Sequence, residues 1–306
     1  MAVSGSVRLS IGALPVGFPP SLRREGVPLN TLVLTVFIGL GSTLAGFLGA
    51  LTGLGGGIVI TPLLTLAFGV DIRYAVGATL VSVIATSSGA AAAYVREGLT
   101  NIRIGMFLEV ATTLGAVAGA AVALRIPTSV IAVIFGIVLL YSAYVSSRPV
   151  PVPVEGDGPD RLAHRLRMDS TYPSVDGTKA YHVQNVPAGF GLMFVAGVLS
   201  GLLGIGSGAV KVIAMDQAMR IPFKVSTTTS NFMIGVTAAA SVGIYLKRGY
   251  VDPGLAMPVM LGVLLGSFLG ARVLPKLRAR VLRIVFSLVV VVLALEMLYH
   301  GLAGRI

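Results

Sequence analysis

The sequence predicts an all-α, polytopic membrane protein built from two similar halves. Of its 306 residues, 55% are hydrophobic and only 11% are charged, and the mean hydropathy is +0.91. A soluble domain carries about a quarter charged residues and avoids large exposed apolar areas. The chain has no cysteine, which excludes a disulfide-stapled module and thiol chemistry. A helical bundle in a bilayer is the class that remains.

Ten apolar runs follow an N-terminal tail, residues 1–29, which we expect to be flexible. Most runs are near 20 residues long, enough for about 30 Å of hydrocarbon. The two runs that follow glycine clusters are shorter, so we expect half-helices or re-entrant segments there. The expected segments are 30–51, 57–70, 73–95, 104–124, 128–146, 187–203, 208–219, 224–246, 255–274 and 281–300.

A polar linker, 147–186, divides the runs into a first transmembrane repeat, 30–146, and a second, 187–302. A shift of 151 residues places 46–143 on 197–294 without a gap, and 21 of these 98 positions are identical. The identities cluster at the glycines. Two copies of a five-segment unit, each with a broken helix near its start, are typical of secondary transporters. Since five is odd, the second copy is expected to be inverted.

The basic residues predict the orientation of the chain. With ten crossings, 14 Lys and Arg lie on one side of the membrane and 8 on the other, leaving out Lys211 as intramembrane. The positive-inside rule then places the 96–103 loop and the linker, which we expect to be hydrated and flexible, in the cytoplasm of a plasma-membrane protein. Four crossings per half give 13 to 9 and the same placement, so the topology of the short segments stays open. The net charge of +11 suggests anionic lipid and an anionic solute as partners rather than nucleic acid.

Two glycine motifs mark the expected breaks, Gly53-Leu54-Gly55-Gly56-Gly57 and Gly204-Ile205-Gly206-Ser207-Gly208. Glycine runs weaken a helix by roughly 1 kcal/mol per residue and free backbone groups that lipid cannot satisfy. Unwound loops followed by a helix N-terminus can hold an anion with their N–H groups. The alternative is close helix packing through small residues.

These motifs carry a resemblance to a known family. The chain resembles the TauE/SafE family of sulfite and organosulfur anion exporters over about residues 30–300, through the GxGGG-type element that opens each half. The second copy departs from the pattern, because Ser207 replaces a glycine and Ile213 stands where the first copy has Pro62. The resemblance implies a two-repeat exporter, and it leaves the substrate open.

The two copies differ most at 75–80 and 226–231, where Ala-Val-Gly-Ala-Thr-Leu in the first copy aligns with Ser-Thr-Thr-Thr-Ser-Asn in the second. The hydroxyl and amide groups of the second stretch could bind sulfonate or sulfite oxygens. We expect this of Thr228, Ser230 and Asn231, with Thr79 as the repeat partner of Ser230. Alternatively, the hydroxyls bond back to their own helix and Asn231 joins two helices.

Lys211 is the sharpest single candidate, because its repeat partner is Ile60 and the scaffold does not require a charge there. An ammonium in hydrocarbon costs about 2.5 kcal/mol or more, so Lys211 needs a carboxylate, a wet cavity or an anionic substrate. Asp216 is one possible carboxylate, although its i+5 spacing is poor helical geometry. Snorkelling to an interface is the alternative.

Glu109 lies inside the fourth apolar run, opposite Met260 in the repeat. Burial favours the neutral form of a carboxyl group, which suits a residue that couples transport to protons. Alternatively, Glu109 lies near an interface. The three histidines share no metal-ligand spacing and no nucleophile–base pair is visible, so we expect no metal, no cofactor and no enzyme activity.

The sequence thus favours a secondary transporter that exports a small sulfur-containing anion, such as sulfite or an organosulfonate, by alternating access. Each negative charge leaving a cell gains about 2.3 kcal/mol per 100 mV, so export of a monoanion can run on the potential. An anion channel, or a carrier for another small anion such as a carboxylate, is the alternative. The expected substrate-binding residues are Gly53, Gly55, Gly56, Gly57, Thr79, Gly204, Gly206, Ser207, Gly208, Lys211, Thr228, Ser230 and Asn231.

Overall fold

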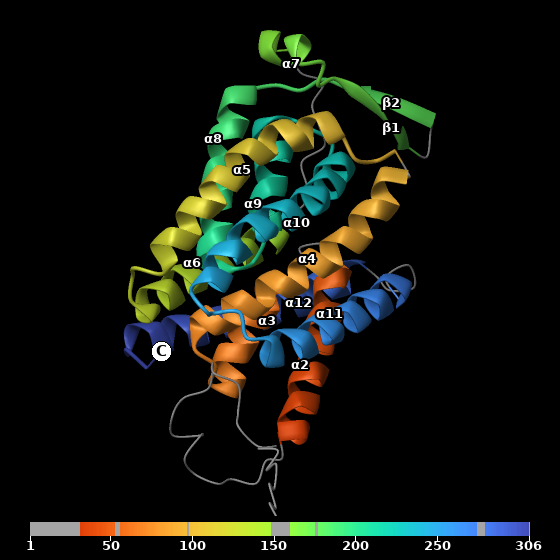
Figure 1. The fold of residues 1–306 in the computed structure, drawn as a ribbon. Coiled ribbons are helices and arrows are strands. Elements are labelled where there is room, and N and C mark those ends of the chain that lie inside the picture. The colour runs from red at the N-terminus through yellow and green to blue at the C-terminus, as the bar shows by residue number, and fades with distance from the viewer. Residues whose placement is uncertain are drawn as a thin grey trace, which may run out of the picture.

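The computed structural model is a bundle of helices with a small hairpin at one end (Figure 1). It describes residues 31–52, 56–96, 98–147, 160–174, 177–273 and 279–305, so the N-terminal tail lies outside the described residues. The first half contains α2 (Thr31–Thr52), α3 (Gly57–Pro62), the π-helical η1 (Leu63–Ala67), α4 (Ile72–Arg96), α5 (Ile102–Ala123) and α6 (Thr128–Ser147). The second half contains α8 (Val186–Leu203), α9 (Gly208–Ile213), the π-helical η2 (Ala214–Ala218), α10 (Phe223–Lys247), α11 (Pro253–Val273) and α12 (Ala279–Leu302).

Four helices in the described part of the chain are long and apolar enough to cross a membrane. They are Ile102–Ala123, Val186–Leu203, Phe223–Lys247 and Pro253–Gly270. Many large apolar side chains of the bundle point outward, including Leu44, Leu265 and Leu288, each more than 60% exposed. A bundle with an apolar outer surface is suited to lipid rather than water. The predicted helical membrane fold is therefore confirmed to this extent.

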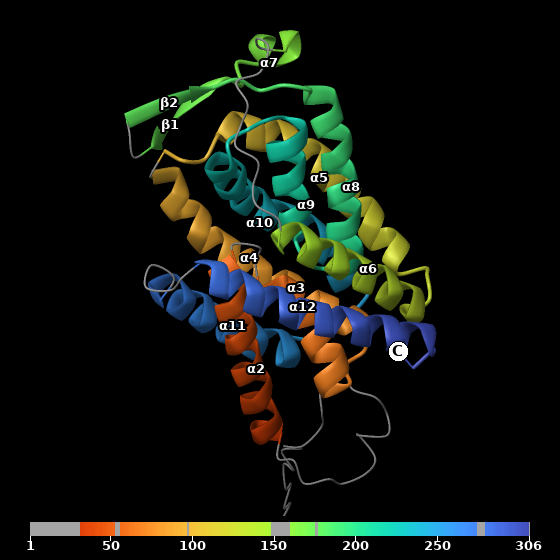
Figure 2. The same cartoon turned by 180° about the vertical axis from the view of Figure 1, so that it is seen from behind.

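The helix boundaries of the two halves correspond. Adding 151 to the bounds of α3, η1 and α4 gives the bounds of α9, η2 and α10. The main helix pairs also follow this correspondence. Helix α2 packs against α11 and α5 packs against α8, while α4 packs against α10 and α6 against α12 (Figure 2). Each pairing thus joins one half to the other.

Glycines allow two of these pairings to be very close. A Cβ atom on Gly197 of α8 would collide with the carbonyl group of Thr112 on α5. A Cβ atom on Gly46 of α2 would lie 2.5 Å from the carbonyl oxygen of Val263 on α11. The two contacts correspond under the 151-residue shift, because Gly46 aligns with Gly197 and Thr112 aligns with Val263. Small residues at the same places therefore let backbones meet in both interfaces.

Helices α4 and α10 cross the centre of the bundle in opposite directions. Near the start of α10, the Thr228 hydroxyl donates to the carbonyl oxygen of Leu99, which follows α4. At the other end, Tyr250, which follows α10, packs edge-on against Tyr74 near the start of α4, with 5.2 Å between ring centroids. The two helices are therefore antiparallel neighbours.

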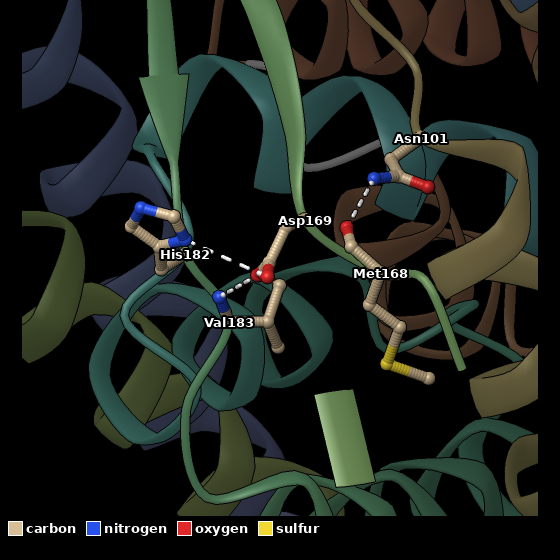
Figure 3. Close-up of polar contacts among 5 residues, drawn as sticks. All are labelled: Asn101, Met168, Asp169, His182 and Val183. Carbon is tan, nitrogen blue, oxygen red and sulfur yellow. Dashed lines mark hydrogen bonds and ion pairs between the residues drawn. The ribbon is translucent and has the colours of Figure 1, made fainter. Parts of the chain in front are cut away.

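The linker is more ordered than we expected from its polarity. It contains α7 (Arg161–Arg165) and an antiparallel hairpin of β1 (Ser170–Ser174) and β2 (Gly177–Tyr181), here called the linker cap. Asp169 fixes the end of the hairpin: its Oδ1 accepts from Val183 N at 2.9 Å, and its Oδ2 lies 3.5 Å from His182 Nδ1 (Figure 3). The prediction of a flexible linker is therefore wrong for these described residues.

Polar and apolar contacts dock the linker cap on the bundle. The Asn101 amide donates to Met168 O at 3.0 Å (Figure 3). It also donates to the Tyr181 hydroxyl at 2.7 Å, while the Asn101 Oδ1 caps α5 by accepting from Ile104 N. Met168, Tyr181 and Val183 are buried in one apolar cluster with residues of α5 and α8. The apolar side chains are few and scattered along a polar segment, so their joint burial has no periodic pattern in the sequence.

Candidate functional site

The second glycine motif is a break between two helices. Helix α8 ends at Leu203 and α9 begins at Gly208, and the residues between them are not helical. Gly204, Gly206 and Ser207 have φ angles of 71°, 69° and 47°. This left-handed region is open to glycine and strained for other residues, so Ser207 is held there by its surroundings.

The first motif is described only in part. Gly53 and Gly55 lie outside the described residues, whereas Gly56 precedes α3 with ordinary right-handed backbone and Gly57 begins that helix. Gly57 contacts the second break, because a Cβ atom on it would lie 3.3 Å from Ile205 Cα. The starts of the two short helices therefore lie close together in the bundle.

The second break is also tightly packed. A Cβ atom on Gly204 would lie 2.7 Å from Val76 Cγ1, and one on Gly206 would lie 2.8 Å from Ile234 Cγ2. Both contacts are with the crossing pair α4 and α10. The glycines therefore serve close packing in this conformation, and anion binding by their amides stays a prediction.

Lys211 lies one turn into α9 and is completely buried, with an exposed fraction of 0%. Its Nζ donates to Thr237 Oγ1 of α10 at 2.6 Å. Thr237 Oγ1 in turn donates to Glu109 Oε1 of α5 at 2.7 Å. The carboxylate that faces the ammonium is thus Glu109 through a shared hydroxyl, and not Asp216, which we considered from the sequence.

Glu109 is itself only 7% exposed. Its Oε1 accepts a second hydrogen bond, from the Thr113 hydroxyl one turn later on α5, at 3.1 Å. Its Oε2 is buried and has no hydrogen-bond partner among the described residues. A buried carboxylate oxygen without a partner is costly, so it marks a place where a proton or another donor belongs.

Some polar residues near the start of α10 make structural hydrogen bonds, and the role of the others is not fixed by their contacts. The Thr228 hydroxyl is close to carbonyl oxygens of its own helix and to Leu99 O at 2.9 Å, which ties α10 to the end of α4. Ser230 donates to Gly208 O at 3.3 Å, and Asn231 is half-buried. Thr79, the repeat partner of Ser230, accepts from Thr61 at 2.9 Å. Their roles in binding substrate stay predictions.

Two polar groups of this site, Thr237 and Thr113, were not predicted from the sequence, whereas Ser207 was. Thr237 bridges Lys211 and Glu109, Thr113 supports Glu109, and the predicted Ser207 has a hydroxyl that is buried without a partner among the described residues. The positions of Thr237 and Thr113 had a signal in the residue spacing. Thr237 follows Ser230 by seven residues and Thr113 follows Glu109 by four, so each lies on the same helix face as a residue already chosen.

The charged cluster joins α5 of the first half to α9 and α10 of the second, and the positions related by 151 residues carry no charge. At the positions related by 151 residues, Lys211 and Glu109 correspond to Ile60 and Met260. Thr237 corresponds to Thr86, whose hydroxyl donates to backbone carbonyls of its own helix, with Ser82 O at 3.1 Å. Among the described residues, the pair of Lys211 and Glu109 therefore has no charged counterpart at the positions shifted by 151 residues.

Comparison with known proteins agrees with this architecture. The family described as "Sulfite exporter TauE/SafE" matches residues 38–297. The probable membrane transporter protein YunE of Bacillus subtilis is 27% identical over 282 residues, covering 89% of this chain and 99% of the relative. YdhB of the same organism, also named a probable membrane transporter protein, is 28% identical over 243 residues, covering 79% and 89%.

A similar relative occurs in an archaeon. The probable membrane transporter protein MJ0441 of Methanocaldococcus jannaschii is 25% identical over 285 residues, covering 88% of this chain and 96% of the relative. No solved structure matches the chain. The matched family spans most of the chain, including both short helices and the buried charged cluster. The chain is therefore a membrane transporter, not an enzyme, and it belongs to the TauE/SafE sulfite exporter family.

Proposed function

We propose that this protein is a secondary transporter of the plasma membrane that exports a small sulfur-containing anion, such as sulfite or an organosulfonate, by alternating access. The observation that carries the proposal is the fully buried Lys211 beside the break at Gly204–Ser207. A buried ammonium costs several kcal/mol unless it is compensated, and such residues in membrane proteins mark ion and substrate pathways. Ser207, four positions before Lys211, adds a buried hydroxyl that has no hydrogen-bond partner within the described part of the chain.

The packing of each long helix of one half against a helix of the other half supports alternating access. Residues 30–146 and 187–302 are proposed to be inverted repeats, which the antiparallel pairing of α4 with α10 favours. Because the break is tightly packed against Val76 and Ile234, this conformation is closed at the glycines. In transporters with inverted repeats, movement of one bundle against the other opens the binding site at the helix breaks to each side of the membrane in turn. The linker cap is proposed to lie in the cytoplasm.

In the open conformation, we expect the anion to be held by Lys211, Ser207 and the main-chain N–H groups that begin α9, with Ser230 and Asn231 of α10 beside them. Sulfite and sulfonates offer several acceptor oxygens, which match an ammonium, hydroxyls and amides. Gly56 and Gly57 are the corresponding groups of the first half. Glu109 is the proposed coupling residue, with protons as the coupling ion.

Flux measurements in liposomes test the proposal. Purified protein is reconstituted and the exchange of sulfite, thiosulfate, taurine, sulfoacetate, methanesulfonate and acetate is measured. We expect saturable flux and counterflow for sulfite or a sulfonate, with Lys211→Met and Asn231→Ala reducing that flux at least tenfold. Lys247→Met, at the exposed last turn of α10, is the matched control and should transport like the wild type.

Each result has a definite meaning. Single-channel currents in place of saturable counterflow would identify an anion channel, and preferential movement of acetate would identify a carboxylate carrier. If Lys211→Met and Asn231→Ala both move every anion as fast as the wild type, the substrate does not bind at the break, although the family assignment is unaffected.

A further inference from the structure

We infer that Glu109 is a built-in substitute for the transported anion, so that each anion crosses the membrane together with one proton and without net charge. In the empty carrier the Glu109 carboxylate neutralises Lys211, and in the loaded carrier the anion does so while Glu109 carries the proton. The inference rests on the transport function proposed above and specifies its stoichiometry and its driving force.

The first support is the geometry of the charge pair. The ammonium and the carboxylate are both buried and share one hydroxyl, through contacts of 2.6 Å and 2.7 Å at Thr237 Oγ1. One positive and one negative charge in a low-dielectric interior cancel, whereas either one alone is expensive. An anion that reaches Lys211 would leave two negative charges facing one positive charge. The site regains neutrality if Glu109 takes up a proton.

The second support is a free proton acceptor in the right place. Oε1 of Glu109 is held by Thr237 and Thr113, but Oε2 has no partner among the described residues and is buried. A proton on Oε2 forms a neutral acid without breaking the two hydrogen bonds that Oε1 accepts. The arrangement therefore fits both protonation states of the side chain.

The third support is that, among the residues the structure describes, Lys211 is the charged group that faces Glu109 from the surrounding elements. Helix α8, which packs on α5, has no titratable residue in its sequence. Helix α10 carries Lys224 and Lys247 near its ends and Tyr245, whose hydroxyl donates to Gly201 O. On α5 itself, Arg103 reaches out to the linker cap, and on η2, Asp216 is half-buried.

The balance of charge and protons follows from these two states. The empty site holds one ammonium and one carboxylate, and the loaded site holds one ammonium, one carboxylic acid and one monovalent anion, so both are neutral. The proton enters from the same side as the anion, forms the O–H bond on Glu109, and leaves with the anion on the other side. The membrane potential then does not drive transport, unlike the potential-driven export that the sequence suggested, and the direction follows the combined anion and proton gradients.

The absence of a second charge pair sets the stoichiometry. Ile60 and Met260 occupy the repeat-related positions of Lys211 and Glu109. The site related by the 151-residue shift, which would join Ile60 and Met260, thus offers no equivalent place for a second compensated anion. One anion and one proton per cycle is the expectation.

The test separates the two driving forces in liposomes. Methanesulfonate is the probe, since its single charge does not depend on pH; if it is not carried, hydrogensulfite is used below the second ionisation of sulfite. A pH gradient of one unit should accumulate the probe about 10-fold in wild-type vesicles, because one proton accompanies each anion. A potassium diffusion potential of 100 mV with valinomycin should cause no accumulation.

Glu109→Gln, which mimics the protonated state, should reverse this pattern. The pH gradient should then have no effect, and 100 mV should accumulate the monoanion about 50-fold, as 2.3 kcal/mol at about 1.4 kcal/mol per decade requires. Glu296→Gln, near the end of α12 and paired with His300 at 3.6 Å, is the control that should behave like the wild type.

The wild-type measurement decides the inference even if Glu109→Gln does not fold. Accumulation of the anion by the potential in wild-type vesicles refutes it, and so does a Glu109→Gln variant that keeps its response to pH. If wild-type vesicles move no anion of the panel at all, the proposed transport function fails instead, and the two failures are distinct.

Discussion

A double-mutant cycle at the buried charge pair gives the sharpest test of the structural reasoning. The two changes are Lys211→Met and Glu109→Met, singly and together. Methionine occupies position 260, which lies 151 residues after Glu109, and it is therefore the apolar substitute chosen for Glu109. Each single change removes one charge and leaves the other buried, because Lys211 is 0% and Glu109 is 7% exposed.

The expected cost follows from that burial. Removing one partner of a buried ion pair costs about 3–5 kcal/mol, whereas replacing both by apolar residues is often neutral. Since a stranded carboxylate or ammonium can neutralise itself by gaining or losing a proton, and since Thr237 still offers a hydroxyl, we expect about 3 kcal/mol for each single variant. The double variant should lie within about 1 kcal/mol of the wild type, which gives a coupling energy of about 5–7 kcal/mol.

The assay is reversible unfolding of the purified protein in one detergent at one pH. If unfolding scales as in soluble chains of similar size, about 3 kcal/mol lowers the midpoint by about 6–12 °C. Lys247→Met serves as the control for removing a lysine that is exposed. Single variants that each cost less than about 1 kcal/mol, or a double variant that costs their sum, would refute the view that these two charges stabilise each other.

Three further predictions concern the interfaces and the linker cap. Gly197→Ala should cost about 1–3 kcal/mol of stability because its methyl group collides with a backbone carbonyl of α5, whereas Gly191→Ala, with open space around it, should be neutral or stabilising by thermal unfolding. Burial raises the pKa of Tyr181 above its usual 10.0, so its stabilisation of the cap is present below about pH 10 and is lost as the pH rises through the raised value. Limited proteolysis of the cap should show this alkaline step, and Tyr181→Phe should remove it. Thr237→Val should reduce anion flux in liposomes at least tenfold, whereas Thr86→Val, its repeat-related control, should leave the flux within about twofold; equal effects of the two would contradict a bridging role for Thr237.

Much of the fold could be predicted from the sequence because it depends on composition and spacing. The apolar runs predicted most helix cores, and the two glycine clusters predicted short segments at 57–70 and 208–219, where α3 and α9 begin at Gly57 and Gly208. The linker cap could not be predicted in the same way. Its order depends on a few apolar side chains and on Asn101, which joins α5, the hairpin and Met168 across distant parts of the chain.

The sequence by itself determined that this protein is a helical membrane transporter and that Lys211 and Glu109 are unusual, because an ionisable group in an apolar run is costly wherever the chain places it. Only the tertiary structure decided that these two residues, 102 positions apart, compensate each other through Thr237. Hydrophobic pattern fixes which side chains avoid water, but the pairing of charges depends on how helices cross, and side-chain contacts between helices leave no periodic signal in one sequence.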